Sequence, residues 1–371
     1  MMMRKINKPI KALYIHIPFC HIICDYCDFP KLQYFRNFAR QYLQKLEEEM
    51  QKQKINPGIK TIYVGGGTPT SLEDDLFEQL LGIIKPYTKD VSEYTFEANP
   101  ESLTKKKLKL MKKYGVNRLS IGVQTTNNEV LASVNRKHTF LDVQKAMQNA
   151  RKAKFDNINI DLIIGLPGVN KEMFRKDLEN VLLLNPDHVS CYSLTVHEHT
   201  VFHTKGISEP TDDVSREFYD IAEEVLTSNG FIHYEVSNWA KEGKESQHNL
   251  TYWKDEMYYG VGLGAAGYVN ATRYTNTRNL TKYLDGQFIE EEEVVDIKDD
   301  KLYYLMLNLR TRYGINFEKY SIRFHEEFLE GRKDAISRLV SNGLLTMDEN
   351  GIYPTYQGMM VLDTIIMELD V

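Results

Sequence analysis

The chain has 371 residues, of which 42% are apolar and 26% are charged, a composition typical of soluble globular proteins with two or three domains. Its net charge of −6 argues against a nucleic-acid partner, because such partners require a basic face. No apolar run approaches the length of a membrane span, so we expect a cytoplasmic protein with at most peripheral membrane contact.

Between residues 13 and 196 a unit recurs, in which a short β-rich run, a loop and an amphipathic helix follow one another. The expected strands are Leu13–Ile17, Thr61–Val64, Tyr94–Ala98, Arg118–Val123, Ile158–Ile164 and Val189–Leu194. The expected helices are Asn37–Gln51, Leu72–Ile84, Thr104–Tyr114, Phe140–Ala153 and Lys171–Leu184. This alternation predicts right-handed crossovers and a parallel α/β sheet. The pattern fits a doubly wound sheet and a TIM-like barrel equally well, and both bind ligands at the C-terminal strand ends.

The loop after the first strand contains three of the chain's four cysteines, Cys20, Cys24 and Cys27, with C-x3-C-x2-C spacing. One turning loop can therefore aim three thiolates at a single point. A structural zinc site normally has four ligands, and only a nearby histidine could supply the fourth here. Disulfides are disfavoured, because the remaining cysteine, Cys191, lies far away in sequence. Three thiolates on a four-iron cluster leave one iron open, which suits a cluster that must bind a substrate or cofactor.

A glycine-rich segment and four polar residues follow at or near later strand ends. The segment Gly65-Gly66-Gly67-Thr68-Pro69-Thr70 comes directly after the second strand, and glycines let backbone amides approach a ligand closely. A tight strand-to-helix turn is the alternative interpretation. The four polar residues are Glu97, Gln124, Arg136 and Asp161. Ordinary strand-end or helix-end polarity can explain the first three, whereas a carboxylate inside N-I-D-L-I-I would be buried and would need a partner.

Together these motifs resemble the radical S-adenosylmethionine (SAM) family of oxygen-independent coproporphyrinogen III oxidase-like proteins. The run Y-I-H-I-P-F-C that ends at Cys20, and Phe29 after the last cysteine, are similar to its haem-chaperone branch. The resemblance implies an incomplete parallel (β/α)6 TIM-like barrel over residues 1–210. It also implies that Cys20, Cys24 and Cys27 hold a [4Fe-4S] cluster and that SAM binds beside it.

The same resemblance assigns roles to single residues of a SAM pocket. Matching positions imply that Gly66, Gly67 and Thr68 contact the methionyl part of SAM, and that Glu97 binds its amino group. Tyr14 is expected to pack against the site.

Three further positions match the family's SAM pocket. Gln124 and Asp161 are expected to bind the ribose. Arg136 is expected to bind the carboxylate or a nearby anionic group. SAM offers a partner to each of them, because it carries ribose hydroxyls and a carboxylate as well as its cationic groups.

Residues 211–298 are expected to extend the barrel and contain the segment Q-H-N-L-T-Y-W from Gln247 to Trp253. Alone, His248 is typical of a hydrogen-bonded histidine beside aromatic packing. The H-N-x-x-Y-W pattern, however, resembles the haem-chaperone branch, where it is linked to haem binding. That resemblance makes His248 a haem-ligand candidate, with Tyr252 and Trp253 able to stack on a porphyrin.

The acidic run Glu290–Glu293 predicts a solvated connection to the last segment. Residues 299–371 have the pattern of helices, a hairpin and a closing helix, which resembles a small α+β winged helix. This segment holds 8 Lys and Arg against 12 Asp and Glu, a net charge of −4, which is the wrong sign for phosphate binding. We therefore expect a lid or an interaction module.

The first functional hypothesis is a haem chaperone that holds the cluster and SAM, accepts haem as cargo and passes it to an unidentified acceptor protein. An electron donor for the cluster is a second expected partner. The alternative is a radical SAM enzyme that acts on a tetrapyrrole through a 5′-deoxyadenosyl radical; a zinc-stabilised scaffold is a third reading. The true oxidases carry a further x-C after the motif and a longer N-terminal arm. Here Asp28-Phe29 follow Cys27 and 19 residues precede Cys20, which counts against coproporphyrinogen III oxidation.

Overall fold

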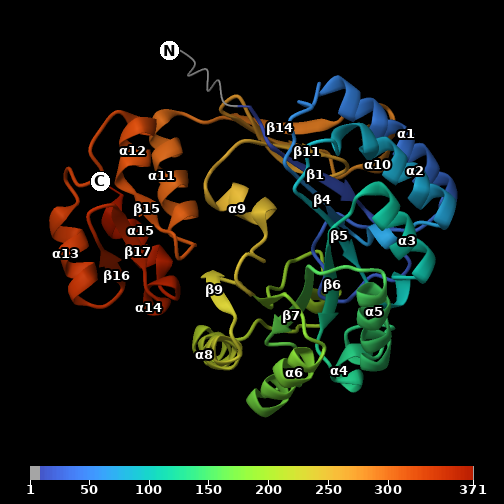
Figure 1. Ribbon diagram of the computed structural model, residues 1–371, viewed down its shortest axis with the longest axis horizontal. Helices are drawn as coiled ribbons and strands as arrows, with labels where there is room; N and C mark the ends of the chain where they lie inside the picture. Colours follow the sequence, from blue (N-terminus) through green and yellow to red (C-terminus); the bar gives the residue numbers. More distant parts are fainter. Residues whose placement is uncertain (1–8, 371) are drawn as a thin grey trace.

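The computed structural model describes residues 9–370, and its centre is a curved, mostly parallel sheet (Figure 1). Six strands of this sheet pair in parallel, side by side in the order in which they occur along the chain. They are β1 (Ala12–Ile17), β4 (Thr61–Gly66), β5 (Glu93–Ala98), β6 (Arg118–Gln124), β7 (Ile158–Ile164) and β8 (His188–Ser193). Each contains or overlaps an expected strand, and the predicted incomplete parallel α/β barrel is confirmed.

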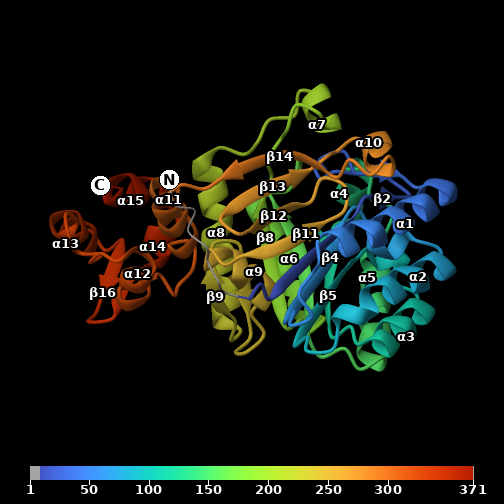
Figure 2. The ribbon, with the colours of Figure 1, turned by 90° about the horizontal axis from the view of Figure 1, so that it is seen from above.

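Helices cover the outer face of this sheet (Figures 1 and 2). They are α1 (Arg36–Lys52), α2 (Asp74–Ile84), α3 (Lys105–Tyr114), α5 (Phe140–Lys152) and α6 (Lys171–Leu183). The short helix α4 (Asn128–Ser133) follows β6 and packs instead in a separate apolar cluster with Leu166, Leu194 and Phe202. Several begin at a side-chain cap: Thr104, for example, accepts a hydrogen bond from the backbone of Lys107 at 3.2 Å. The α3 helix then ends at Gly115, whose φ of 94° is a left-handed conformation that favours glycine.

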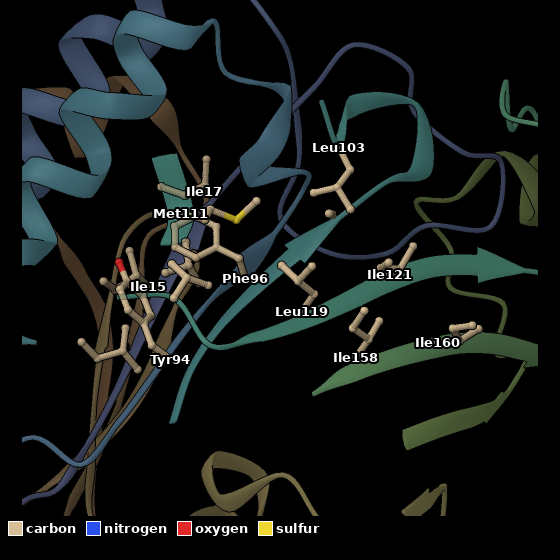
Figure 3. Packing of buried hydrophobic residues seen from close by; sticks show 14 of the residues in the cluster. Ile15, Ile17, Tyr94, Phe96, Leu103, Met111, Leu119, Ile121, Ile158 and Ile160 are labelled. Atoms are coloured by element: carbon tan, nitrogen blue, oxygen red, sulfur yellow. The ribbon is translucent and has the colours of Figure 1, made fainter. Parts of the chain in front are cut away.

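The barrel strands alternate between apolar and polar side chains, because one face meets the helices and the other faces the barrel interior. Figure 3 shows the apolar face, where Phe96 of β5 lies close to Met111 of α3 and Ile121 of β6 belongs to the same buried cluster. Burying one such side chain contributes roughly 1.5–3 kcal/mol. The intervening residues, such as Glu97 and Asp161, are polar and face inward. A parallel sheet is usually apolar on both faces, so this polar interior marks a binding site.

Further strands extend the sheet beyond the six-strand barrel. The strand β11 (Tyr258–Val261) runs parallel to β1 on its free side, and three antiparallel strands continue outward. These strands are β12 (Ala266–Val269), β13 (Thr272–Asn276) and β14 (Ile289–Val294). At the other edge β8 is followed by β10 (Asn238–Ala240) and β9 (Ile232–Glu235). Four helices lie between these strands or lead to them: α7 (Val201–Thr204), α8 (Asp212–Ser228), α9 (Gln247–Trp253) and α10 (Leu280–Leu284).

The expectation that Glu290–Glu293 form a solvated connection is wrong. These residues lie in the edge strand β14 and pair with β13, for example Glu292 with Tyr274. Every side chain of β14 is exposed, so the backbone is paired while the carboxylates stay in water. Charges on an edge strand also discourage pairing with another chain.

The C-terminal part is a small α+β unit with its own core, built from residues such as Leu305, Ile336 and Ile365. Its helices are α11 (Ile297–Asn308), α12 (Phe317–Phe324), α13 (Lys333–Ser341), α14 (Tyr356–Met359) and α15 (Leu362–Leu369). Its strands β15 (Ile315–Asn316), β16 (Leu345–Met347) and β17 (Gly351–Pro354) form a sheet in the order β15-β17-β16. The predicted small α+β fold is confirmed, whereas the domain boundary at residue 299 stays a prediction. Among residues 9–370, no helix combines the length and the apolar character that crossing a membrane requires.

Candidate functional site

The cysteine loop leaves the C-terminal end of β1, and backbone hydrogen bonds fix both of its ends. The short strands β2 (Phe19–Cys20) and β3 (Leu32–Gln33) pair in parallel, with Leu32 N–H donating to Pro18 O at 2.7 Å. All three thiols are free of disulfides, and Cys20 is buried while Cys24 and Cys27 are half-buried. The three cysteines line one cavity of about 480 Å³ at the C-terminal ends of the barrel strands.

The glycine-rich segment after β4 packs directly on this loop. Gly67 N–H donates to Ile17 O at 2.9 Å, and Thr68 N–H donates to Phe19 O at 3.0 Å. The Thr68 hydroxyl lies 3.6 Å from Cys20 Sγ. A Cβ atom on Gly67 would lie 2.7 Å from the oxygen of Pro18 and 2.9 Å from Cys20 Sγ. Only glycine therefore fits at Gly67, which together with Gly66 and Thr68 lines the cavity.

Glu97 lies at the C-terminal end of β5, with its carboxylate directed into the cavity. Gly66 N–H donates to one carboxylate oxygen at 2.9 Å, and the Tyr63 hydroxyl donates to the other at 2.8 Å. Burial raises the pKa of Glu97 from 4.5 to about 7, although the hydrogen bond from Tyr63 lowers it in part. This carboxylate therefore changes charge near neutral pH. Tyr63 also lines the cavity and was missed by the sequence analysis, although its inward position on β4 follows from strand alternation.

Asp161 is half-buried in β7 and lines the cavity, and its carboxylate has the partners that the sequence led us to expect. Ser120 donates to one oxygen at 3.0 Å and Asn159 donates to the other at 2.7 Å. Burial raises the pKa of Asp161, while these hydrogen bonds oppose the shift. Asp161 and Ser120 line the cavity. Sequence analysis missed Ser120 and Asn159, whose only signal is their inward-facing register with Asp161.

Gln124 and Arg136 complete the ring of polar groups around the cavity. Gln124 ends β6 with a φ of 70°, an uncommon left-handed conformation for a residue other than glycine. The Arg136 guanidinium donates to Gly122 O and, at 3.5 Å, to Cys24 Sγ. Its Nε is buried without a hydrogen-bond partner among the described residues. A cation with an unused donor beside the cysteines is suited to an anionic ligand group.

Tyr14 lies beneath the cavity and is not among the residues that line it. Its hydroxyl donates to His16 Nδ1 at 2.9 Å, because His16 Nε2–H donates to Pro30 O at 2.7 Å. Burial lowers the pKa of His16 to about 4, so the ring is neutral. Tyr14 thus supports the end of the cysteine loop through His16, and its role in binding SAM stays a prediction.

His248 lies outside the cavity lining. Its ring is buried, with Nδ1 2.9 Å from the Thr61 hydroxyl and Nε2 2.7 Å from the Tyr252 hydroxyl. Both ring nitrogens are therefore engaged within the protein. The haem-ligand role of His248 stays a prediction, and the described contacts offer iron no free nitrogen there.

The residues of the cavity fit the two groups that the cysteine motif implies. Three free thiols line the same cavity, and burial raises the pKa of the Cys20 thiol to about 12, so its thiolate needs a cation beside it. The iron of a cluster supplies such a charge. The carboxylates of Glu97 and Asp161 and the guanidinium of Arg136 line the same cavity, which suits a ligand that carries both charges.

Comparison with known proteins agrees with this arrangement. Residues 14–181 match the family model of the radical SAM superfamily, and residues 304–361 match that of the HemN C-terminal domain. The solved structure of coproporphyrinogen III oxidase (HemN) from Escherichia coli superposes with a TM-score of 0.85. It covers 100% of this chain and 92% of that one at 23% identity, which establishes a shared fold. Fold and site thus define a radical SAM protein.

Curated relatives narrow the family further. The chain is 39% identical to the heme chaperone HemW of Lactococcus lactis subsp. lactis (strain IL1403), over 95% of each chain. It is 37% identical to HemW of Bacillus subtilis (strain 168), over 95% of this chain and 97% of that one. For HemW of Escherichia coli (strain K12) the identity is 32%, over 82% of this chain and 84% of that one. The chain therefore belongs to the radical SAM family that contains the HemW proteins.

Proposed function

We propose that the protein is a haem chaperone, which holds a [4Fe-4S] cluster on Cys20, Cys24 and Cys27 and binds SAM beside it. The observation that carries the proposal is the convergence of the three thiols, the glycine-rich segment and the inward carboxylates on one cavity. Membership of the family whose relatives are named heme chaperone HemW supports haem as the cargo. When bound, the cluster supplies one-electron chemistry to SAM.

The residues around the cavity divide the recognition of SAM between them. Gly66, Gly67 and Thr68 hold the methionyl part, because their backbone lies against the cysteine loop with no intervening side chain. Glu97 accepts hydrogen bonds from the amino group. Its carboxylate is already oriented by Gly66 N–H and by a tyrosine hydroxyl.

The other two sides of the ligand meet the far wall. Asp161 and Gln124 bind the ribose hydroxyls, and the guanidinium of Arg136 binds the carboxylate. Asp161 is suited to this role because Ser120 and Asn159 hold its carboxylate in place before any ligand arrives. A preorganised acceptor loses less conformational freedom on binding.

Anaerobic reconstitution with iron and sulfide tests the cluster and SAM parts of the proposal. The wild type is expected to take up four irons per chain. Because three thiolates leave one iron of the cluster open, its spectrum is expected to change when SAM is added. The C20A/C24A/C27A variant is expected to take up none. Cys191→Ala is the matched control, because Cys191 is buried in β8 and lies outside the cavity lining. Zinc or no metal in the wild type would refute the assignment.

Titration with ferric haem tests the cargo. Stoichiometric binding, followed by transfer to apomyoglobin as a generic scavenger, is the expected result. An unidentified acceptor protein and an electron donor for the cluster complete this proposal.

A radical SAM enzyme that acts on a tetrapyrrole is the second candidate, favoured by the carboxylates, guanidinium and glycine-rich segment that line the same cavity as the three thiols. It predicts 5′-deoxyadenosine formation that depends on an added porphyrinogen under reducing conditions. The chaperone predicts haem uptake without such formation. One anaerobic assay with both readouts therefore separates the two.

A further inference from the structure

Helix α9, which carries the H-N-x-x-Y-W segment, closes the barrel at the end opposite the cysteine loop. The backbone N–H groups of Gln247 and His248 both donate to the Glu93 carboxylate at 2.9 Å. Thr61, the partner of the His248 ring, is the first residue of β4, and Glu93 is the first residue of β5. The helix therefore sits at the N-terminal strand ends, whereas the cavity lies at the C-terminal ends.

The α9 plug (Gln247–Trp253) is held from both sides. In Figure 1 it lies between the barrel and the C-terminal helices. The Arg310 guanidinium of the C-terminal part lies 5.2 Å from the ring centre of Trp253, and the His248 side chain enters the barrel. Bringing a haem iron to His248 would require breaking both ring hydrogen bonds and removing this helix. The His248 side chain is fully buried, and both ring nitrogens that a haem ligand would need are used in hydrogen bonds within the protein.

Tyr63 connects the plug to the cavity. Its ring centre lies 5.4 Å from that of His248, with the two planes inclined by 31°. The Tyr63 hydroxyl donates to Glu97 at 2.8 Å, and Tyr63 itself lines the cavity. The ring of Tyr14 packs on another part of Tyr63, with the centres 6.2 Å apart. A displacement of His248 therefore frees the ring of Tyr63, which carries the donor that orients the Glu97 carboxylate.

We infer that His248 is a positioning residue for SAM: as part of the α9 plug it holds Tyr63 against Glu97, and it is not an axial ligand of haem. This inference rests on the proposed function, because it takes SAM as the ligand of Glu97. It assigns to the H-N-x-x-Y-W segment a supporting role behind Tyr63, outside the lining of the cofactor pocket. The segment affects haem only through that pocket.

The test measures the Kd for SAM by calorimetry on reconstituted, anaerobic protein, for the single variants His248→Ala and Tyr63→Phe and for the double variant. Each single change is expected to raise the Kd about tenfold, the effect of one lost or misdirected hydrogen bond to a charged group. The double variant is expected to be no weaker than about tenfold, because both residues act through the same contact. His203→Ala is the matched control, since that histidine is exposed on α7.

Electron paramagnetic resonance of the ferric haem complex supplies the second readout. The His248→Ala spectrum is expected to retain the axial-ligand signature of the wild type. If His248→Ala does not fold, Tyr252→Phe, which removes only the hydrogen bond to His248 Nε2, replaces it and is expected to raise the SAM Kd about threefold.

Three results would overturn the inference: a SAM Kd within twofold of the wild type in the folded variants, single effects that multiply in the double variant, or loss of the haem signature on changing His248. Failure of the wild type to bind SAM and haem would instead refute the proposed function. The two failures are thus distinguishable.

Discussion

Replacing Glu97 by Gln tests whether its half-buried carboxylate is the acceptor for the SAM amino group. The change keeps the shape of the side chain and removes its charge. In the wild type both oxygens accept hydrogen bonds, from Gly66 N–H and from the Tyr63 hydroxyl, so the new amide group must face a donor on one side. Hydrogen bonds to charged groups contribute about 1.5–3 kcal/mol, so we expect the Kd for SAM to rise by about 10- to 150-fold at pH 7.5.

The pH dependence gives a sharper magnitude. Burial raises the pKa of Glu97 to about 7, so the carboxylate is about three-quarters ionised at pH 7.5 and about 3% ionised at pH 5.5. If only the ionised form binds SAM, the wild-type Kd rises about 25-fold between these two pH values through this group. SAM's own titration affects both proteins equally. The wild-type ratio of the two Kd values should therefore exceed the Glu97→Gln ratio by about 25-fold.

Calorimetric titration of reconstituted protein at the two pH values checks this. Glu172→Gln, at an exposed position in the first turn of α6, is the matched control and should behave like the wild type. The reasoning is refuted if Glu97→Gln binds SAM as tightly as the wild type at pH 7.5, or keeps the full wild-type ratio. The stability of the fold changes with pH in the opposite direction to SAM affinity. Because the folded pKa of Glu97 lies above 4.5, ionising this group lowers the free energy of unfolding by up to ~3 kcal/mol. This loss is absent below pH 4.5 and complete above pH 7.

Three further changes probe the site and the fold. Gly67→Ala would place a Cβ 2.9 Å from Cys20 Sγ, so we expect iron and sulfide analysis to show a loss of at least about half of the cluster. Gly82→Ala, which has open space around the new Cβ, is the control and should load the cluster fully. Equal cluster loading in the two variants would contradict the steric argument. Arg118→Met removes a buried cation that lowers the pKa of Glu97, so the pH midpoint for SAM binding should move upward, and an unchanged or lower midpoint would count against it. Arg323→Ala breaks an ion pair with the buried Asp255, N to O 2.5 Å, between the C-terminal part and the barrel extension. Urea unfolding should show a loss of about 2 kcal/mol or more, and a loss below 0.5 kcal/mol would mean that the pair is only a surface contact.

The sequence by itself determined the parts that depend on local periodicity and on one general rule of topology. The strand Ile158–Ile164 was predicted with the bounds that the structure has, because its run of branched apolar residues is long and ends clearly. The need of Asp161 for hydrogen-bond partners followed from the same run. The convergence of the cysteine loop and the glycine-rich segment followed because parallel strands bring their C-terminal ends to one edge.

Only the tertiary structure decided which distant segments complete the site. The His248 backbone N–H binds the Glu93 carboxylate across 155 positions of sequence, and no local pattern in either segment encodes that contact. The same holds for β11, which pairs beside β1, and for the acidic run that becomes the edge strand β14. Such pairings depend on which surfaces the barrel leaves unburied, and the pattern of one sequence does not reveal those surfaces. The physical reason is that periodicity states which face of an element is buried, whereas the packed chain alone determines what buries it.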